Sequence, residues 1–325
     1  MIKSAGVAIK AALVLVLVPL LLSGPAMADN YPERPVRIIV PIGAGGSYDF
    51  VGRLLANRLS ELMGQSFFVE NRTGAGTLVG TQSAATAPAD GYTLLVGGLS
   101  NMVFNFALYQ KVGYAPNDFV PIALVYTFPY VMVSRSDLPQ KSLGEIVSYA
   151  RQSPGKLTIA HAGTGSGQQI VSAAFMRLTG TSMIEVPYRT TQGAYVDMLA
   201  GRVDLLFDSA AAALPYIAAK KVRGVALLAP QRYRTVPDLP TITEAGLSGL
   251  GIESWIGLFA PAGTPPEVLD KLRSTTRVAA EDLKEKFETS GGGLMQMPVA
   301  DTDKFIKSEF DLWTRVIRGA GIHLD

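Results

Sequence analysis

A short β-branched run followed at once by a glycine-rich stretch constrains this chain most strongly. Residues 36–40 (Val-Arg-Ile-Ile-Val) are typical of a buried strand, and Pro41 ends it. The next residues include three glycines, after which apolar residues recur from Val51 at helical spacing. We expect Ser47 to cap this helix and Asp49 to lie in its first turn. Such a loop offers backbone N–H groups to an anion, although a plain connection between strand and helix also needs glycine.

The same order of elements recurs along the chain. Further strands are predicted at 67–70, 92–96, 157–160, 184–188 and 203–207, and most of them run into loops of small or polar residues. Alternating strands and helices predict an α/β fold of mostly parallel sheets flanked by helices. In such sheets ligands bind outside the carboxyl ends of the strands, so these loops are the expected binding site.

Two long apolar stretches predict that the chain crosses twice between two lobes. Residues 120–134 form the first stretch, and residues 254–261 form the second. We therefore expect lobe 1 to comprise 29–128 and 254–325, and lobe 2 to comprise 129–253. Two crossing strands make a hinge, and the strand-end loops of both lobes would then face one cleft.

The first 28 residues predict a cleavable export signal. Lys3 and Lys10 supply its positive end, an apolar core follows at 11–22, and Ala26-Met-Ala is a small-residue cleavage site. No later stretch is long and apolar enough to cross a membrane. The chain has no cysteine, which excludes disulfides and thiolate chemistry and fits a bacterial periplasm.

The charge balance argues against a nucleic-acid partner. The formal charge is +2, from 29 basic and 27 acidic residues, but two of the lysines belong to the predicted signal. The remaining chain therefore has 27 basic and 27 acidic residues and a net charge of zero. It contains no basic run, so we expect no binding to nucleic acid.

The sequence offers weak support for catalysis. The glycine loops lack the spacing of a dinucleotide fingerprint, and no Gly-Lys-Ser/Thr phosphate loop exists. A secreted hydrolase would use Ser166 as nucleophile and His161 as base, but Thr164 stands where a nucleophile elbow needs glycine. Two histidines and no cysteine are too few for a zinc site. We expect no catalytic residue, no metal and no cofactor.

Binding of a small anion is the better-supported alternative. Backbone amides from loops in both lobes can hold carboxylate oxygens without a formal positive charge. Hydroxyl donors are available at Ser47, Thr77, Ser100, Thr164 and Ser166, although each of them can equally be a helix cap. Asp208 is an exception, because a carboxylate at a strand end repels an anion unless it accepts a hydrogen bond from the ligand or from a helix N-terminus.

Over essentially the whole mature chain, the sequence resembles the solute-binding proteins of tripartite tricarboxylate transporters, the Bug or TctC-like family. The matching segments are Tyr31-Pro-Glu-Arg-Pro-Val-Arg-Ile-Ile-Val-Pro, Ala44-Gly-Gly with Asp49, Val69-Glu-Asn-Arg-Thr-Gly-Ala-Gly, Asp90-Gly-Tyr-Thr-Leu-Leu, Pro154-Gly-Lys-Leu, Gly163-Thr-Gly-Ser, Val186-Pro-Tyr, Gly201-Arg-Val-Asp, Pro237-Asp-Leu-Pro-Thr and Ala260-Pro-Ala-Gly-Thr-Pro. The resemblance implies a two-lobed type II periplasmic binding fold that closes on a small carboxylate. It also implies a non-enzymatic, monomeric protein that delivers its ligand to a membrane permease.

The resemblance also implies which residues meet the ligand. The family's ligand loops correspond here to Gly45, Gly46, Ser47 and Asp49, and to Gly163, Thr164, Gly165 and Ser166, while the equivalent of Asp208 lines the pocket. Together with the residues chosen from the loop pattern, the full candidate set is Gly43, Ala44, Gly45, Gly46, Ser47, Asp49, Thr77, Ser100, Asn101, His161, Gly163, Thr164, Gly165, Ser166, Tyr188, Arg189 and Asp208.

Two departures from the family pattern bear on the ligand. Gln168 and Gln169 stand where family members often have a histidine, and Arg189 with Thr190 replaces the common Lys-Gly. The Arg189 side chain could pair with a second carboxylate. A module that reports ligand to a membrane kinase remains an alternative, since sensing and transport require the same closure.

Overall fold

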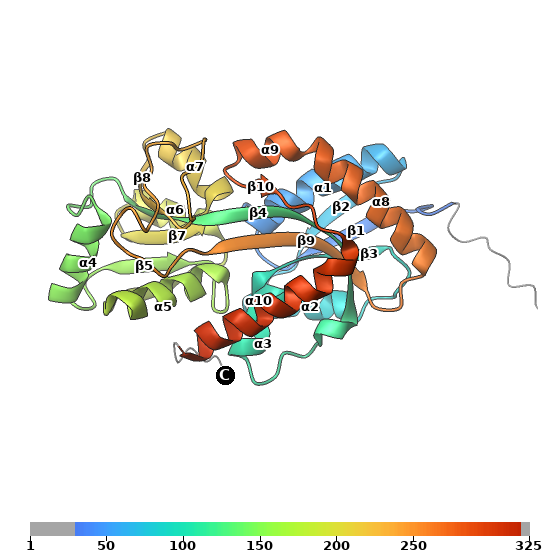
Figure 1. Cartoon of the computed structure of the whole chain (residues 1–325), viewed down its shortest axis with the longest axis horizontal. Coiled ribbons are helices and arrows are strands. Elements are labelled where there is room, and N and C mark those ends of the chain that lie inside the picture. Colours follow the sequence, from blue (N-terminus) through green and yellow to red (C-terminus); the bar gives the residue numbers. More distant parts are fainter. Residues whose placement is uncertain (1–29, 320–325) are drawn as a thin grey trace, which may run out of the picture.

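Strand β4 (Phe119–Arg135) is the element that both halves of the fold share (Figure 1). The structure, a computed structural model, describes residues 30–319. Its sheet follows the strand order β2-β1-β3-β9-β4-β7-β5-β6, and β8 and β10 each pair with β4 as well. Most of β4 is buried, because its aromatic and β-branched residues serve the core over nearly its whole length.

The other elements have the following bounds. The strands are β1 (Val36–Val40), β2 (Phe67–Asn71), β3 (Thr93–Gly98), β5 (Thr158–His161), β6 (Ile184–Pro187), β7 (Leu205–Ser209), β8 (Val222–Leu227), β9 (Glu253–Pro261) and β10 (Gly293–Leu294). The helices are α1 (Ser47–Met63), α2 (Leu78–Ala85), α3 (Asn105–Leu108), α4 (Leu143–Gln152), α5 (Gly167–Thr179), α6 (Thr191–Leu199), α7 (Ala210–Ala218), α8 (Pro266–Asp282), α9 (Lys284–Thr289) and α10 (Val299–Gly319). Short turns of π-helix and 3₁₀-helix occupy Ser100–Phe104 and Pro116–Asp118.

Parallel pairing is found in both halves of the sheet. Strand β1 pairs in parallel with β2 and β3, and β5 pairs in parallel with β6 and β7. Every antiparallel pair among the described strands includes β4 or β9, the two long strands that lie side by side in Figure 1. The predicted α/β fold of helix-flanked sheets is therefore confirmed.

The strand pairing of β4 changes partway along its length. Up to Pro129 it pairs with β9, and from Tyr130 it pairs with β7 and β8. This switch lies between residues 129 and 130, one residue after the predicted lobe boundary at 128/129. The two lobes remain a proposed division of the fold, and the predicted signal at 1–28 lies outside the described residues.

Two local expectations differ from the structure. Helix α1 begins at Ser47, and Gly46 takes the capping position with no side-chain cap. Ser47 is therefore the first helical residue rather than the cap. Asp208 is the penultimate residue of β7, so this strand extends two residues beyond the predicted 203–207 and Asp208 lies at its end as expected.

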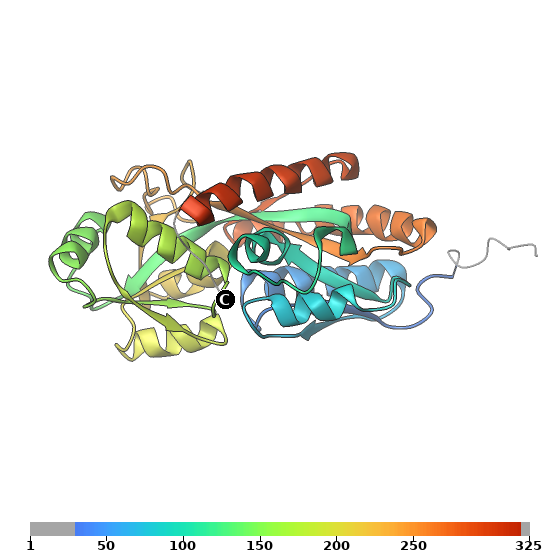
Figure 2. The same cartoon turned by 90° about the horizontal axis from the view of Figure 1, so that it is seen from below.

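Helix α10 packs along the side of the fold where the two halves meet (Figure 2). Its buried Trp313 contacts Phe104 in an edge-to-face arrangement with ring centroids 4.9 Å apart. Phe310 lies against Phe106 at 6.3 Å. The aromatic residues of this amphipathic helix are therefore packing residues, as its sequence predicts.

We expect Trp313→Ala to lower the free energy of unfolding by about 3–5 kcal/mol, since it removes a buried aromatic side chain and leaves a cavity. Leu312→Ala is the matched control on the same helix, because Leu312 is 44% exposed. Urea denaturation measures both variants. Equal losses in the two variants would contradict the packing of α10 described above.

Candidate functional site

A cavity of about 480 Å³ lies among the loops that follow β1, β2, β5 and β6. Its lining residues are Ile42, Gly43, Thr73, Gly74, Ala75, Gly76, Ala162, Gly163, Thr164, Pro187, Tyr188 and Arg189. Among these described residues, Arg189 alone has a charged side chain, and none is acidic. The loops of both halves therefore share one cavity whose only side-chain charge is positive.

The loops from the two halves approach each other too closely for an extra methyl group. A Cβ added at Gly43 would lie 2.7 Å from the Arg189 carbonyl oxygen and 2.7 Å from Cγ2 of Thr190. A Cβ added at Gly76 would lie 2.4 Å from the Thr164 carbonyl oxygen. Since real Cβ atoms do not approach backbone atoms this closely, glycine allows the two halves to close on each other.

Several backbone amides that line the cavity have no partner within the described part of the chain. The N–H groups of Gly43, Gly163 and Thr164 donate to no other described residue. Gly43 follows β1, whereas Gly163 and Thr164 follow β5. Donors for an anion are therefore present on both sides of the cavity.

The loop from Thr73 to Gly76 lines the cavity but is missing from the predicted site. Three successive residues in it have positive φ: 148° at Gly74, 44° at Ala75 and 69° at Gly76. Ala75 is one of two non-glycine residues with positive φ in the described chain. The Gly-Ala-Gly sequence after β2 was the available signal, because it marks the same small-residue strand end as the other ligand loops.

Asp49 holds its own loop in place. Its carboxylate accepts hydrogen bonds from the Gly45 amide at 3.0 Å, from Arg53 Nε at 2.9 Å and from Asn71 Nδ2 at 2.9 Å. Burial favours the neutral acid, but these donors outweigh burial and lower the pKa of Asp49. The carboxylate therefore fixes the conformation of the loop. The Gly45 amide donates to Asp49 and is not available to a ligand.

The loop after β5 is built in the same way. The Gly165 amide donates to Gln169 Oε1 at 2.7 Å, and Gln169 is the third residue of α5, just as Asp49 is the third residue of α1. In both halves, a side chain of the first helical turn therefore binds an amide four residues earlier. The same turn geometry is fixed once by a charged group and once by a neutral one.

Four further predicted residues make internal hydrogen bonds. Ser166 caps α5 by accepting from the Gln169 amide at 3.3 Å, and Thr77 Oγ1 accepts from Asn105 Nδ2 at 2.8 Å. Asn101 Oδ1 accepts from the Gly98 amide at 2.9 Å, and the Ser100 amide donates to the Tyr48 hydroxyl at 3.2 Å. All four are buried, and none lines the cavity.

His161 and Ser166 do not form a nucleophile–base pair. The Nδ1 atom of His161 lies 2.9 Å from the Gly163 carbonyl oxygen, which fixes it as the donor to that carbonyl. Burial lowers the pKa of His161 and keeps the imidazole neutral. No hydrogen bond joins His161 to Ser166 in the described chain, so the arrangement that a hydrolase needs is not assembled.

Asp208 is fully buried, and only one of its two carboxylate oxygens accepts a hydrogen bond from a described residue. Its Oδ1 accepts from the Ser209 amide at 2.8 Å and, over a longer 3.4 Å, from Gln168 Nε2. Its Oδ2, the Tyr195 hydroxyl and the Ser209 hydroxyl have no hydrogen-bond partner among the described residues. Burial raises the pKa of Asp208 to about 7, because it outweighs the hydrogen bonds from the Ser209 amide and Gln168 that favour the ionised form.

The predicted site residues therefore separate into two groups. Those that line the cavity are Gly43, Gly163, Thr164, Tyr188 and Arg189. Those that lie outside its lining are Ala44, Gly45, Gly46, Ser47, Asp49, Thr77, Ser100, Asn101, His161, Gly165, Ser166 and Asp208. Tyr188 donates its hydroxyl to Asp197 at 2.7 Å, whereas the exposed Arg189 side chain makes no hydrogen bond or ion pair with a described residue.

The buried carboxyl of Asp208 predicts a pH-dependent stability. The folded protein keeps this proton up to about pH 7, whereas the unfolded chain releases it near pH 4. The folded state binds more protons in that window, so the free energy of unfolding falls as the pH rises through it. Relative to Asp208→Asn, the wild type should lose roughly 2 kcal/mol between pH 5 and pH 8.

Thermal or urea unfolding across this pH range measures the difference. Asp303→Asn, which alters an exposed carboxylate, provides the control and should track the wild type at every pH. Parallel pH curves for the wild type and the Asp208→Asn variant would show that this carboxyl is already ionised at pH 5.

The chain is similar to known proteins in sequence and in fold. Residues 51–322 match the family described as the tripartite tricarboxylate transporter family receptor. Protein BugT of Bordetella pertussis is 32% identical over 307 residues, which cover 93% of this chain and 94% of BugT. Within the described residues, no helix is long and apolar enough to cross a membrane.

Two solved structures share both the fold and a substantial part of the sequence. R. palustris Rpa4515 with adipate is 32% identical, with a TM-score of 0.86, and the match covers 90% of this chain and all of that protein. MatC from Rhodopseudomonas palustris with bound malate is 32% identical, with a TM-score of 0.84, and the match covers 88% of this chain and all of MatC. The chain therefore belongs to the tripartite tricarboxylate transporter receptor family, the Bug and TctC-like solute-binding proteins.

Proposed function

We propose that this protein is a periplasmic receptor that captures a small organic carboxylate between its two lobes and delivers it to a membrane transporter. One observation carries the proposal: the amides of Gly43, Gly163 and Thr164 come from both halves of the fold and line one cavity. Within residues 30–319, these amides have no hydrogen-bond partner and no acidic side chain lines the cavity. The related structures with adipate and malate support a carboxylate as the ligand.

The binding chemistry follows from the geometry of the loops. Each carboxylate oxygen accepts charge-assisted hydrogen bonds from backbone N–H groups, which are stronger than hydrogen bonds between neutral groups. The loops around Gly43 and Gly76 lie close to the main chain of the opposite half, which brings donors from both halves to one cavity. Asp49 and Gln169 act indirectly, because they hold the two loops in the conformation that leaves the other amides unpaired.

Transport accounts for the remaining features of the chain. The predicted signal at 1–28 and the absence of cysteine fit a periplasmic protein, and the family is described as a receptor family of tripartite tricarboxylate transporters. We expect the receptor to act as a monomer, without a cofactor and without catalysis. No observation favours the hydrolase, since His161 binds a backbone carbonyl and Ser166 caps a helix.

Thermal-shift measurements with a panel of mono-, di- and aromatic carboxylates test the proposal. Ligand at 100 times its Kd should raise the free energy of unfolding by about 2.7 kcal/mol. Mass spectrometry of the solute released from denatured protein identifies the natural ligand independently. A stable protein that responds to no carboxylate and releases none would overturn the proposed function.

Gly43→Ala should weaken carboxylate binding by hindering closure, because the added methyl meets the Arg189 carbonyl and the Thr190 side chain. We expect affinity to fall by about ten-fold or more, which corresponds to about 1.4 kcal/mol. Gly144→Ala provides the control, since its added methyl meets nothing within 4 Å. Isothermal titration calorimetry measures the ligand affinity of both variants. An unchanged affinity in Gly43→Ala would show that closure does not require the close approach of Gly43 to Arg189 and Thr190.

A further inference from the structure

A groove of about 610 Å³ lies between helices α5 and α10, and residues 249–252, which lead into β9, also line it (Figure 1). Leu178 of α5 and Leu312 and Val316 of α10 belong to its lining, with exposed fractions of 45%, 44% and 38%. They are three of the ten large apolar side chains that are exposed between residues 30 and 319. Exposed apolar side chains that gather in one groove, instead of lying singly, are typical of a surface that binds a partner.

The charged residues that line this groove are both arginines. Arg177 of α5 and Arg315 of α10 are exposed, and neither side chain forms a hydrogen bond or ion pair with a residue of the described chain. On the same helix α10, by contrast, Lys307 binds Asp311 at 3.1 Å. Apolar side chains beside two unpaired guanidinium groups complement a segment that combines apolar and acidic side chains.

Helix α5 connects the groove with the ligand cavity. Residues 163–164, in the loop before its first turn, line the cavity, whereas residues 177–178 in its last turn line the groove. The opposite wall belongs to α10, which is anchored by the contact of Trp313 with Phe104 after β3. A partner in the groove therefore contacts the helix that extends from the ligand cavity together with a helix anchored elsewhere in the fold.

We propose that the groove between α5 and α10 is the surface on which the receptor docks an acidic, apolar segment of the membrane subunit that accepts its ligand. This inference rests on the proposed receptor function and adds to it a contact surface. Leu178, Leu312 and Val316 pack against the apolar side chains of that segment. Arg177 and Arg315 bind its carboxylates, because the planar donors of a guanidinium match a carboxylate.

The shape and charge of the groove favour a protein segment over a lipid surface. A concave groove receives inserted side chains, whereas an interfacial membrane contact uses an apolar face that enters the lipid. Recognition of anionic lipid headgroups takes a cluster of about four or more basic residues. The lining of this groove contains two arginines and no lysine.

Binding of the purified, fluorescently labelled receptor to membrane vesicles from the bacterium that makes it tests the docking surface. The measurements are made with the best-binding acid of the carboxylate panel present. One double variant, Arg177→Glu/Arg315→Glu, reverses the charge of the groove. A second double variant, Leu178→Ser/Leu312→Ser, removes its apolar side chains.

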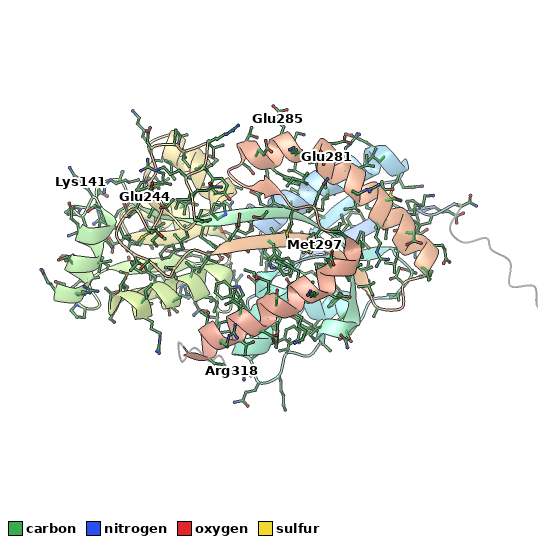
Figure 3. The ribbon with its side chains drawn as sticks, in the orientation of Figure 1. Lys141, Glu244, Glu281, Glu285, Met297 and Arg318 are labelled. Carbon is green, nitrogen blue, oxygen red and sulfur yellow. The ribbon has the colours of Figure 1, made fainter. Side chains whose placement is uncertain are left out.

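Two single variants outside the groove serve as matched controls. Lys141→Glu reverses an exposed positive charge just before α4, at a part of the molecule apart from α10 (Figure 3). Val278→Ser removes an apolar side chain that is 47% exposed, close to the exposed fractions of Leu178 and Leu312. Neither residue lines the groove. Circular dichroism and melting temperature establish that each variant is folded.

Both double variants should bind the vesicles about ten-fold or more weakly than the wild type, because they change residues at the centre of the contact. Uptake of the carboxylate by cells that carry a double variant in place of the wild type should fall in parallel. Isothermal titration calorimetry should show an unchanged carboxylate affinity for the purified variants, since the groove and the ligand cavity share no lining residue. Both controls should behave like the wild type in all three measurements.

Undiminished vesicle binding in either double variant, or no vesicle binding by the wild type, would overturn the assignment. Equal binding to protein-free liposomes of phosphatidylethanolamine and phosphatidylglycerol would identify a lipid surface as the occupant instead. A wild-type dimer in sedimentation velocity that the double variants dissociate would identify a second copy of the chain. Stronger vesicle binding after removal of residues 320–325 would assign the groove to that segment.

Two further outcomes separate the groove from the site. Loss of carboxylate affinity in the double variants would indicate a structural role for the groove residues and would also overturn the assignment. A wild type that binds no carboxylate of any kind would fail the proposed function itself, whatever the vesicles show.

Discussion

The closed site depends on the close approach of main chain to main chain between two halves of one molecule. Gly43 lies against the carbonyl of Arg189, and Gly76 lies against the carbonyl of Thr164, at distances that leave no room for a Cβ atom. This contact brings amides that follow β1 and β5 to one cavity. Anion binding by neutral backbone groups requires such convergence, because a single amide competes poorly with water.

The shared strands explain how one chain supplies both sides of the cavity. Strand β4 pairs with β9 in one half and with β7 and β8 in the other. A single strand therefore runs through both halves and connects their sheets. Helix α10 packs across the side where the halves meet. The closing loops lie at the carboxyl ends of parallel strands β1 and β5, where an α/β sheet places its ligands.

Much of the fold could be predicted from the sequence, because the periodic spacing of apolar residues indicates which side of a strand or helix is buried. The strand–loop–helix order at β1 and α1 and the long crossing stretch at β4 were predicted within a few residues. The helix cap was placed one residue late, since Gly46 rather than Ser47 takes that position. The strand predicted at 203–207 is β7 (Leu205–Ser209), whose last residues are set by pairing with β4.

The site was harder to predict, because the partners of each amide are decided by side-chain geometry. The Gly45 and Gly165 amides are taken by Asp49 and Gln169, and Thr77 and Ser166 serve the fold through their hydroxyls. The spacing of residues in the sequence does not distinguish these hydrogen-bonded amides and hydroxyls from the amides that have no partner among the described residues. The loop after β2 was expected at this edge of the sheet, but residues 73–76 were not selected, because their role depends on a neighbour from the other half.

Nuclear magnetic resonance on ¹⁵N-labelled protein tests the central claim most directly, because it observes the binding amides themselves. Titration with a carboxylate should move the Gly43 and Gly163 amide signals downfield together, with one saturation curve for both. Movement of signals from only one half, or of neither glycine while the ligand binds, would contradict capture of the anion between the two lobes.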